Sequence, residues 1–201
     1  MLKILMIRHS ITEGNKARRY IGTTDEVLSP EGVALVKDVF YPQAQELYVS
    51  PLRRCIETAR LIYPAQKMHI IDDLRECDFG EFENKNYEEL SGNPAYQAWL
   101  DSHAQLPFPG GESREEFHFR TVTAFRRIVD TCIAQKIPSA AVVSHGGTIM
   151  SILEELAYPH KEFYEWSLKN ATGYILEVDT LRWEQMQQQV NVLGRFPGGL
   201  L

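Results

Sequence analysis

The sequence predicts an α/β fold with three layers, in which helices cover both faces of a mostly parallel sheet. Two runs, residues 2–7 and 140–144, are almost wholly apolar and lack the alternation of a half-exposed strand. Such runs are typical of strands buried on both faces of a sheet. Strand-like and helix-like segments alternate over the first and last thirds of the chain, which indicates parallel strands joined by helices.

Short apolar runs bounded by turn residues mark the other strands. Residues 46–49 and 68–71 have this pattern. Residues 174–178 and the segment near 182–186 predict a terminal hairpin. The tail from Asn191 onward is expected to fray, because chain ends are poorly ordered unless something holds them.

Two serine–proline pairs predict the starts of helices. Serine is a favoured N-cap and proline is favoured at the first helical position, so helices are expected to begin at Pro30 and Pro51, with Ser29 and Ser50 as their N-caps. The longest helix is expected to begin at 112–114 and to continue to Ile133, because apolar residues recur there at helical spacing. A further helix is expected at 148–156.

The middle of the chain, from about 77 to 111, breaks this periodicity with glycine, proline, asparagine and aromatic residues. Two short helices are expected there, near 87–90 and 96–102. We interpret this segment as a capping insertion that covers the end of the sheet. The whole chain, residues 1–201, is then a single domain.

The composition limits the expected partners. A chain of 201 residues fits one sizeable domain, and its net charge of -6 argues against a nucleic-acid surface and an anionic membrane. Its three cysteines are widely spaced without a CxxC pair, which supports neither a disulfide framework nor a zinc site. No apolar run suits a signal peptide or a membrane span, so we expect a cytoplasmic protein, as a monomer or a homodimer.

Both fully apolar strands end in a histidine. The first is followed by Arg8-His9-Ser10 and the second, much later, by His145-Gly146. Ligands of open α/β sheets bind just outside the carboxyl ends of the strands. A histidine and an arginine at one strand end would be ordinary, but the second histidine favours a shared site for an anion.

Five short motifs extend this pattern. They are Ile7-Arg8-His9-Ser10 with Thr12 and Asn15, Ser50-Pro51-Leu52-Arg53-Arg54, Leu74-Arg75-Glu76, Pro109-Gly110-Gly111-Glu112-Ser113, and Val143-Ser144-His145-Gly146-Gly147. Each is weak evidence alone, but in this order they resemble the histidine phosphatase superfamily, which includes the cofactor-dependent phosphoglycerate mutases. The resemblance runs over nearly the whole chain and implies the phosphoglycerate mutase-like α/β fold.

The resemblance implies that His9 is the nucleophile and becomes phosphohistidine, since a neutral imidazole can form a covalent intermediate. Arg8 and Arg54 are expected to bind phosphate oxygens with their planar guanidinium groups. His145 is expected to be cationic beside the phosphate and to stabilise developing charge. Glu76 is expected to have a raised pKa, to protonate the leaving alcohol and then to activate water.

Further substrate contacts are expected from Asn15, Thr23 and the backbone amide of Gly146. No metal and no other cofactor is expected, because two arginines and a second histidine already supply positive charge. Ser10 departs from the family, which usually has glycine after the motif histidine. A serine there either weakens phosphate binding or adds a hydroxyl donor.

The short insertion favours a phosphatase over a mutase, because the mutases of the family are usually longer. Among small phosphatases, the motifs are most similar to α-ribazole-5′-phosphate phosphatases. The expected activity is therefore metal-independent hydrolysis of a small phosphorylated metabolite, such as α-ribazole 5′-phosphate. A phosphoglycerate mutase-type phosphotransferase and an inactive phosphate-binding relative remain as alternatives.

Overall fold

The two strands that end in histidines lie side by side at the centre of one sheet. In the computed structural model, which describes residues 1–197 and the backbone of 199 and 200, β1 (Leu2–Arg8) pairs in parallel with β4 (Ser139–Ser144). Arg8 is opposite Ser144, so the residues that follow them, His9 and His145, leave the sheet at the same edge. The predicted pairing of the two strand ends is confirmed.

The sheet is parallel on one side of β1 and mixed on the other. Its order is β3-β2-β4-β1-β6-β7-β5, with β8 paired to β7. The four strands β3, β2, β4 and β1 run parallel to one another, whereas β6 is antiparallel to both β1 and β7. The remaining strands are β2 (Glu46–Val49), β3 (Met68–Ile70), β5 (Ala157–Tyr158), β6 (Gly173–Val178), β7 (Val190–Phe196) and β8 (Gly199–Leu200).

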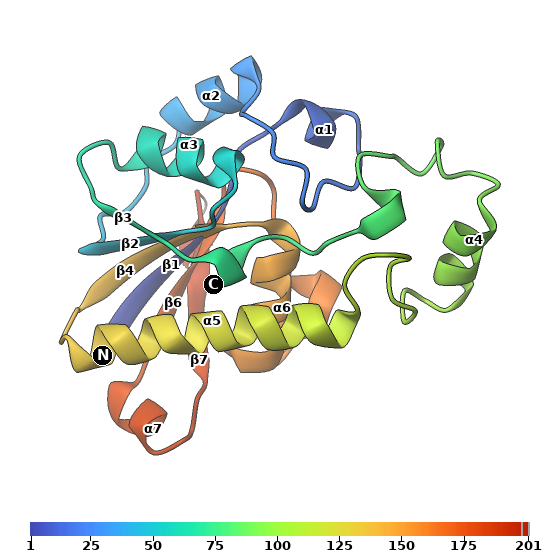
Figure 1. Cartoon of the computed structure of the whole chain (residues 1–201). Coiled ribbons are helices and arrows are strands. Elements are labelled where there is room, and N and C mark those ends of the chain that lie inside the picture. Colours follow the sequence, from blue (N-terminus) through green and yellow to red (C-terminus); the bar gives the residue numbers. More distant parts are fainter. Residues whose placement is uncertain (198, 201) are drawn as a thin grey trace.

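Helices cover both faces of the sheet (Figure 1). α2 (Pro30–Lys37) and α3 (Arg53–Ile62) pack on one face, and α5 (Arg114–Ala134) and α6 (Gly146–Leu156) pack on the other. Along β1 the side chains alternate between two hydrophobic clusters, with Leu5 in the α2–α3 cluster. Its neighbours Ile4 and Met6 belong to the α5–α6 cluster. The predicted three-layer α/β/α fold is therefore confirmed.

The shorter elements lie in the connections. They are the helices α1 (Glu13–Lys16), α4 (Pro94–Asp101) and α7 (Thr180–Glu184), and the 3-10 turns η1 (Asp72–Leu74), η2 (Gly80–Phe82) and η3 (Phe163–Trp166). No helix in the described part of the chain has both the length and the apolar character needed to cross a lipid bilayer.

The capping segment has a small aromatic core of its own, which the interrupted periodicity did not predict. Phe82, Leu90, Tyr96 and Trp99 are buried together, separately from the two clusters on the sheet. The rings of Tyr96 and Trp99 stack with centroids 6.0 Å apart. Tyr20 reaches in from the first third of the chain and donates or accepts a 3.1 Å hydrogen bond with Tyr96. In Figure 1, α4 accordingly stands away from the sheet.

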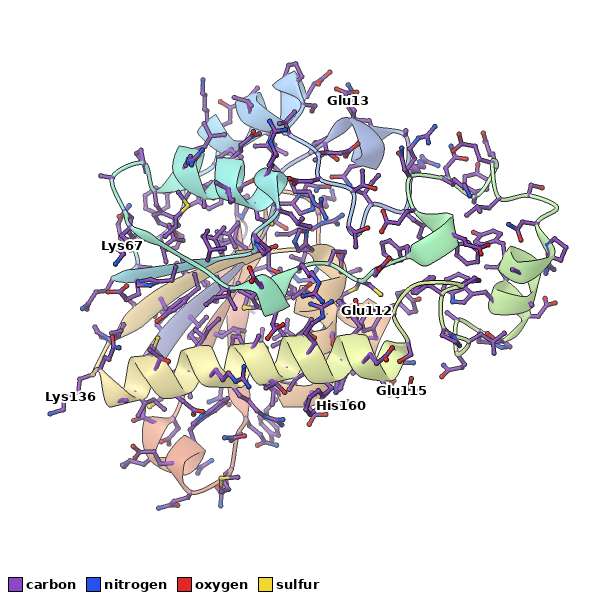
Figure 2. The ribbon with its side chains drawn as sticks, in the orientation of Figure 1. Glu13, Lys67, Glu112, Glu115, Lys136 and His160 are labelled. Atoms are coloured by element: carbon purple, nitrogen blue, oxygen red, sulfur yellow. The ribbon has the colours of Figure 1, made fainter. Side chains whose placement is uncertain are left out.

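A partly buried ion pair anchors the return of this segment to α5. Glu112, labelled in Figure 2, accepts two hydrogen bonds from Arg120, at 2.8 and 2.7 Å. It also accepts the backbone N–H of Asp78 at 3.0 Å. Arg120 in turn donates to the carbonyls of Asp73, Arg75 and Glu76. The pair therefore fixes the backbone on both sides of the Glu76 side chain.

Three local predictions are wrong. α3 begins at Arg53, because the hydroxyl of Ser50 bonds a histidine in the site instead of capping the helix. Residues 87–90 form turns instead of a helix. The strand that pairs with β6 in the terminal hairpin is β7, and the predicted partner segment is mostly α7, because the Asp179 side chain caps that helix.

The expected fraying from Asn191 is also wrong for the residues that the structure describes. Seven residues from Val190 to Phe196 form β7 inside the sheet. Phe196 is buried and its ring meets that of Tyr41 edge to face at 5.9 Å. Burial of this aromatic side chain holds the segment in place.

Candidate active site

His9 is held as a neutral imidazole, and its Nε2 makes no hydrogen bond within the described part of the chain. Its backbone N–H donates to Ser144 at 2.9 Å, and its ring Nδ1 lies 2.7 Å from the carbonyl oxygen of Ser10. A carbonyl only accepts, so Nδ1 carries the proton and Nε2 carries the lone pair. Burial, helped by the charges of Arg54 and Arg8, holds the pKa of His9 well below its ordinary value. These conditions suit a nucleophile.

His145 lies beside His9, with the ring centroids 5.1 Å apart. Its Nδ1 accepts a 3.2 Å hydrogen bond from Nε of Arg54, which can only donate. The proton is therefore on Nε2, which donates to the Ser50 hydroxyl at 2.7 Å. Burial and the charge of Arg54 hold the pKa of His145 well below its ordinary value. These contacts fit the neutral form of the ring, and the expected cation beside a bound phosphate stays a prediction.

Arg54 is fully buried and mostly committed to the protein. Besides its bond to His145, it donates from Nη1 to Thr24 at 2.7 Å and from Nη2 to Ile21 and Gly22 at 3.3 and 2.9 Å, all to carbonyls. Four of its five N–H groups are thus used. Arg54 lies against His145 as predicted. Among the described residues only one of its N–H groups has no acceptor, where a two-pronged grip on phosphate was expected.

Arg8 is the more available cation. Its Nη1 donates to Leu168 at 2.6 Å, while its buried Nε has no hydrogen-bond partner among the described residues. The guanidinium lies against Gly146, where an added Cβ would be 3.3 Å from Nε and Cζ. Gly146 is the first residue of the eleven-residue helix α6, whose first amides point toward incoming anions. Arg8 and the start of α6 therefore form a cationic site that can bind a phosphate group.

Glu76 is brought to the same helix start, as predicted. Its two carboxylate oxygens accept the backbone N–H groups of Cys77 at 3.0 Å and Gly147 at 2.9 Å. Burial raises the pKa of Glu76 above its ordinary value, and the two amides and the arginines only partly oppose it. A Cβ on Gly147 would lie 2.5 Å from the carboxylate, so only glycine leaves room for Glu76 there. The position of the Glu76 carboxyl at the start of α6 and its raised pKa suit it to donate a proton.

Asn15 is oriented by a residue that the sequence analysis missed. Its Oδ1 accepts the N–H of Thr12 at 3.3 Å and Nδ2 of Asn170 at 3.1 Å. Asn170 also donates to the carbonyl of His9 at 3.0 Å. Because the oxygen of Asn15 is held, its amide group is the end left to donate to a ligand. No motif singled out Asn170, which reaches the site only through the fold.

Thr23 and Ser10 are not placed as ligand donors. The backbone N–H of Thr23 donates to Glu83 at 2.8 Å and its side chain is exposed. Ser10 is fully buried, with its hydroxyl donating to the carbonyl of Gly32 at 2.7 Å and its N–H donating to Thr58 at 3.0 Å. The expectation that the Ser10 hydroxyl adds a donor for phosphate is therefore corrected.

Replacing Ser10 with alanine is expected to change stability more than catalysis. The carbonyl of Gly32 loses a buried hydrogen bond, which lowers the free energy of unfolding by about 1–2 kcal/mol. The Ser10 carbonyl that orients His9 is retained, so kcat/KM should stay within about twofold. Urea unfolding and steady-state kinetics of the Ser10→Ala protein check both statements. A tenfold fall in kcat/KM with normal stability would contradict this assignment.

An aromatic cavity of about 260 Å³ opens beside Glu76. Its lining includes Gly147 and, among few charged groups, Arg114. Arg114 is paired with Glu154 at 2.9 Å. Most of the lining is ring surface, from Tyr20, Phe79, Trp99, Phe108, Phe117 and Phe163. The capping segment and η3 thus build an apolar chamber next to the acid.

Comparisons with known proteins show what this chain is similar to. The family model described as the histidine phosphatase superfamily (branch 1) matches residues 4–190. Phosphoglycerate mutase-like protein 4 of Arabidopsis thaliana is 30% identical over 192 residues, 90% of this chain and 82% of that protein. Adenosylcobalamin/alpha-ribazole phosphatase of Salmonella typhimurium is 25% identical over 163 residues, 77% and 79% of the two chains.

A solved structure agrees with these relatives. The phosphoserine phosphatase of Entamoeba histolytica, in complex with 3-phosphoglyceric acid, is 26% identical to this chain and superposes with a TM-score of 0.74. The match covers 88% of this chain and 91% of the other. The names of the relatives include both phosphatases and a mutase-like protein, so they agree on the handling of phosphate esters and differ in substrate.

Proposed function

The chain belongs to branch 1 of the histidine phosphatase superfamily, and from that premise we propose that it is a metal-independent phosphomonoesterase with a phosphohistidine intermediate at His9. One observation carries the proposal. The neutral His9 ring, with Nδ1 tied to a carbonyl, lies 5.1 Å from a second imidazole. The Arg8 guanidinium and the Glu76 carboxyl flank the start of α6 beside them.

In the first step, Nε2 of His9 attacks phosphorus and the bond from phosphorus to the ester oxygen breaks. Glu76 gives its proton to that oxygen, so the alcohol leaves neutral. Arg8 and the backbone N–H of Gly146 stabilise the phosphoryl oxygens. The arriving negative charge also raises the pKa of His145, which favours a protonated ring beside the phosphate.

In the second step, the Glu76 carboxylate takes a proton from water. The resulting oxygen attacks phosphorus, the bond from nitrogen to phosphorus breaks, and inorganic phosphate leaves. His9 returns to its neutral form and Glu76 to its acid form. Each step needs only the protein and water.

The alcohol part of the substrate has to occupy the aromatic cavity, because that space adjoins Glu76. Its ring-lined wall favours esters whose alcohol carries an aromatic group. A phosphorylated nucleoside-like metabolite such as α-ribazole 5′-phosphate fits this chemistry, and the Salmonella relative is named for that substrate. The carboxylate of a small sugar acid would meet one arginine in this cavity, Arg114, and that arginine is already paired with Glu154. We therefore propose a small aromatic phosphate ester, met in the cytoplasm, as substrate.

The test is a panel of phosphate esters assayed with a chelator present. We expect hydrolysis of p-nitrophenyl phosphate at the same rate with and without chelator, and a higher kcat/KM for α-ribazole 5′-phosphate than for phosphoserine or 3-phosphoglycerate. A requirement for added metal would contradict the metal-free mechanism. Isomerisation of phosphoglycerate dependent on a bisphosphate primer would support a mutase instead, and phosphate binding without turnover would indicate an inactive relative.

A further inference from the structure

One carboxylate outside the catalytic pocket collects an unusual number of donors. Glu83, just after η2 in the capping segment, accepts the backbone N–H groups of Gly22, Thr23 and Thr24 at 3.2, 2.8 and 3.4 Å. It also accepts the hydroxyl of Thr24 at 2.7 Å and the N–H of Phe79 at 3.2 Å. Charge-assisted bonds of this kind are the stronger ones. The loop 21–24 is thus fixed to the cap by a single anion.

The same loop turns its carbonyls toward a cation. Ile21, Gly22 and Thr24 present their oxygens to the guanidinium of Arg54, at 3.3, 2.9 and 2.7 Å. Gly22 leaves no space for a side chain, since a Cβ there would be 2.3 Å from Oε1 of Glu83. The loop therefore lies between two charged side chains. Its N–H groups donate to the carboxylate of Glu83, and its carbonyls accept from the buried guanidinium of Arg54.

We infer that Glu83 is a positioning residue that acts on His145 through this loop and Arg54. Arg54 donates from Nε to Nδ1 of His145 at 3.2 Å, and this bond keeps the imidazole proton on Nε2. Without the loop carbonyls, the fully buried guanidinium would lose three of its four acceptors. Leaving such donors unpaired is costly, so Arg54 would turn and release His145.

Glu83 is not needed to keep the cap folded. The aromatic core around Phe82 and Trp99 and the Glu112–Arg120 pair hold the cap independently of it. Removing the charge at Glu83 should therefore loosen the loop while the cap stays docked. Because the loop and the cap respond differently, a positioning role of Glu83 can be distinguished from a general loss of structure.

The first experiment compares Glu83→Gln with Glu81→Gln. Glu81 lies on the same turn, is exposed, and its carboxylate has no hydrogen bond among the described residues. In the parent protein, ¹⁵N NMR of His145 should show the Nε2–H tautomer. In Glu83→Gln a mixture of tautomers is expected, because a glutamine NH₂ group cannot accept the loop amides. The turnover number should fall about 10- to 100-fold, with a smaller change in KM, and Glu81→Gln should match the parent.

The second experiment is a double-mutant cycle with Arg54→Lys. If Glu83 acts through Arg54, adding Glu83→Gln to Arg54→Lys should cost less than about twofold in kcat. If the fold-loss of kcat in the double variant equals the product of the losses in the two single variants, the inference is overturned. An unchanged His145 tautomer in Glu83→Gln would also overturn it. Should Glu83→Gln fold poorly, Thr24→Val removes only the 2.7 Å hydroxyl donor, and it should shift the tautomer in the same direction.

The catalytic readout rests on the proposed function, but the tautomer readout does not. If the parent protein hydrolyses no phosphate ester, the proposed function fails while the NMR comparison still decides the role of Glu83. If the parent is active and Glu83→Gln leaves both the tautomer and the turnover number unchanged, only the positioning inference fails.

Discussion

Replacing His9 with alanine is expected to abolish hydrolysis, with kcat falling at least about 1,000-fold. The reason is that His9 supplies the nitrogen that carries the phosphoryl group, and no nearby thiol can replace it. Burial raises the pKa of the Cys55 thiol to about 12 and also raises that of Cys77. Both thiols therefore stay protonated and unreactive at neutral pH.

The measurement is rapid-quench labelling with a ³²P-labelled ester. The parent protein should become labelled through an acid-labile, base-stable bond, as expected of a phosphoramidate on nitrogen, and His9→Ala should take up no label. His160→Ala is the matched control, because its side chain is 64% exposed and makes none of the site contacts described above. Labelling that persists in His9→Ala, or a parent that turns over without labelling, would contradict the mechanism.

The parts of the fold that were predictable are those encoded locally. The runs 2–7 and 140–144 are apolar enough to be identified as central strands, and their following histidines could be placed together because parallel strands end at one edge. Ser113 and Glu116 likewise form the capping box that starts the long helix. The strands and the helix start follow from neighbouring residues, and the meeting of the two histidines follows from the common direction of parallel strands.

The parts that were not predictable depend on contacts between distant segments. Ser50 looks like an N-cap in sequence, but the fold places it beside His145 because β2 and β4 pair at Val49 and Val143. Asn170 reaches His9 across 161 positions. The lowered pKa of His145 likewise follows from its burial beside Arg54, which no motif encodes.

Replacing Glu76 with glutamine is expected to lower kcat/KM for alkyl phosphates by about 100-fold or more, while p-nitrophenyl phosphate loses less than about tenfold. An alkoxide is a poor leaving group and needs the proton of Glu76, whereas nitrophenolate leaves readily without it. Because kcat/KM reports the first phosphoryl transfer, the two ester classes separate this role from substrate binding. With nitrophenyl phosphate the variant should also show a burst, since water attack on the phosphohistidine still needs a base.

The pH profile provides the second check on Glu76. Its acid form is the active one in the first step, so kcat/KM for alkyl esters should fall as the pH rises through the raised pKa of Glu76. It should also fall as the pH drops through the pKa of His9, which lies below its ordinary value, because the protonated ring has no lone pair. Glu76→Gln should lose only the high-pH limb, and Glu115→Gln, an exposed control labelled in Figure 2, should keep both limbs. Equal losses on alkyl and nitrophenyl esters, with the high-pH limb intact, would mean that another group protonates the leaving oxygen.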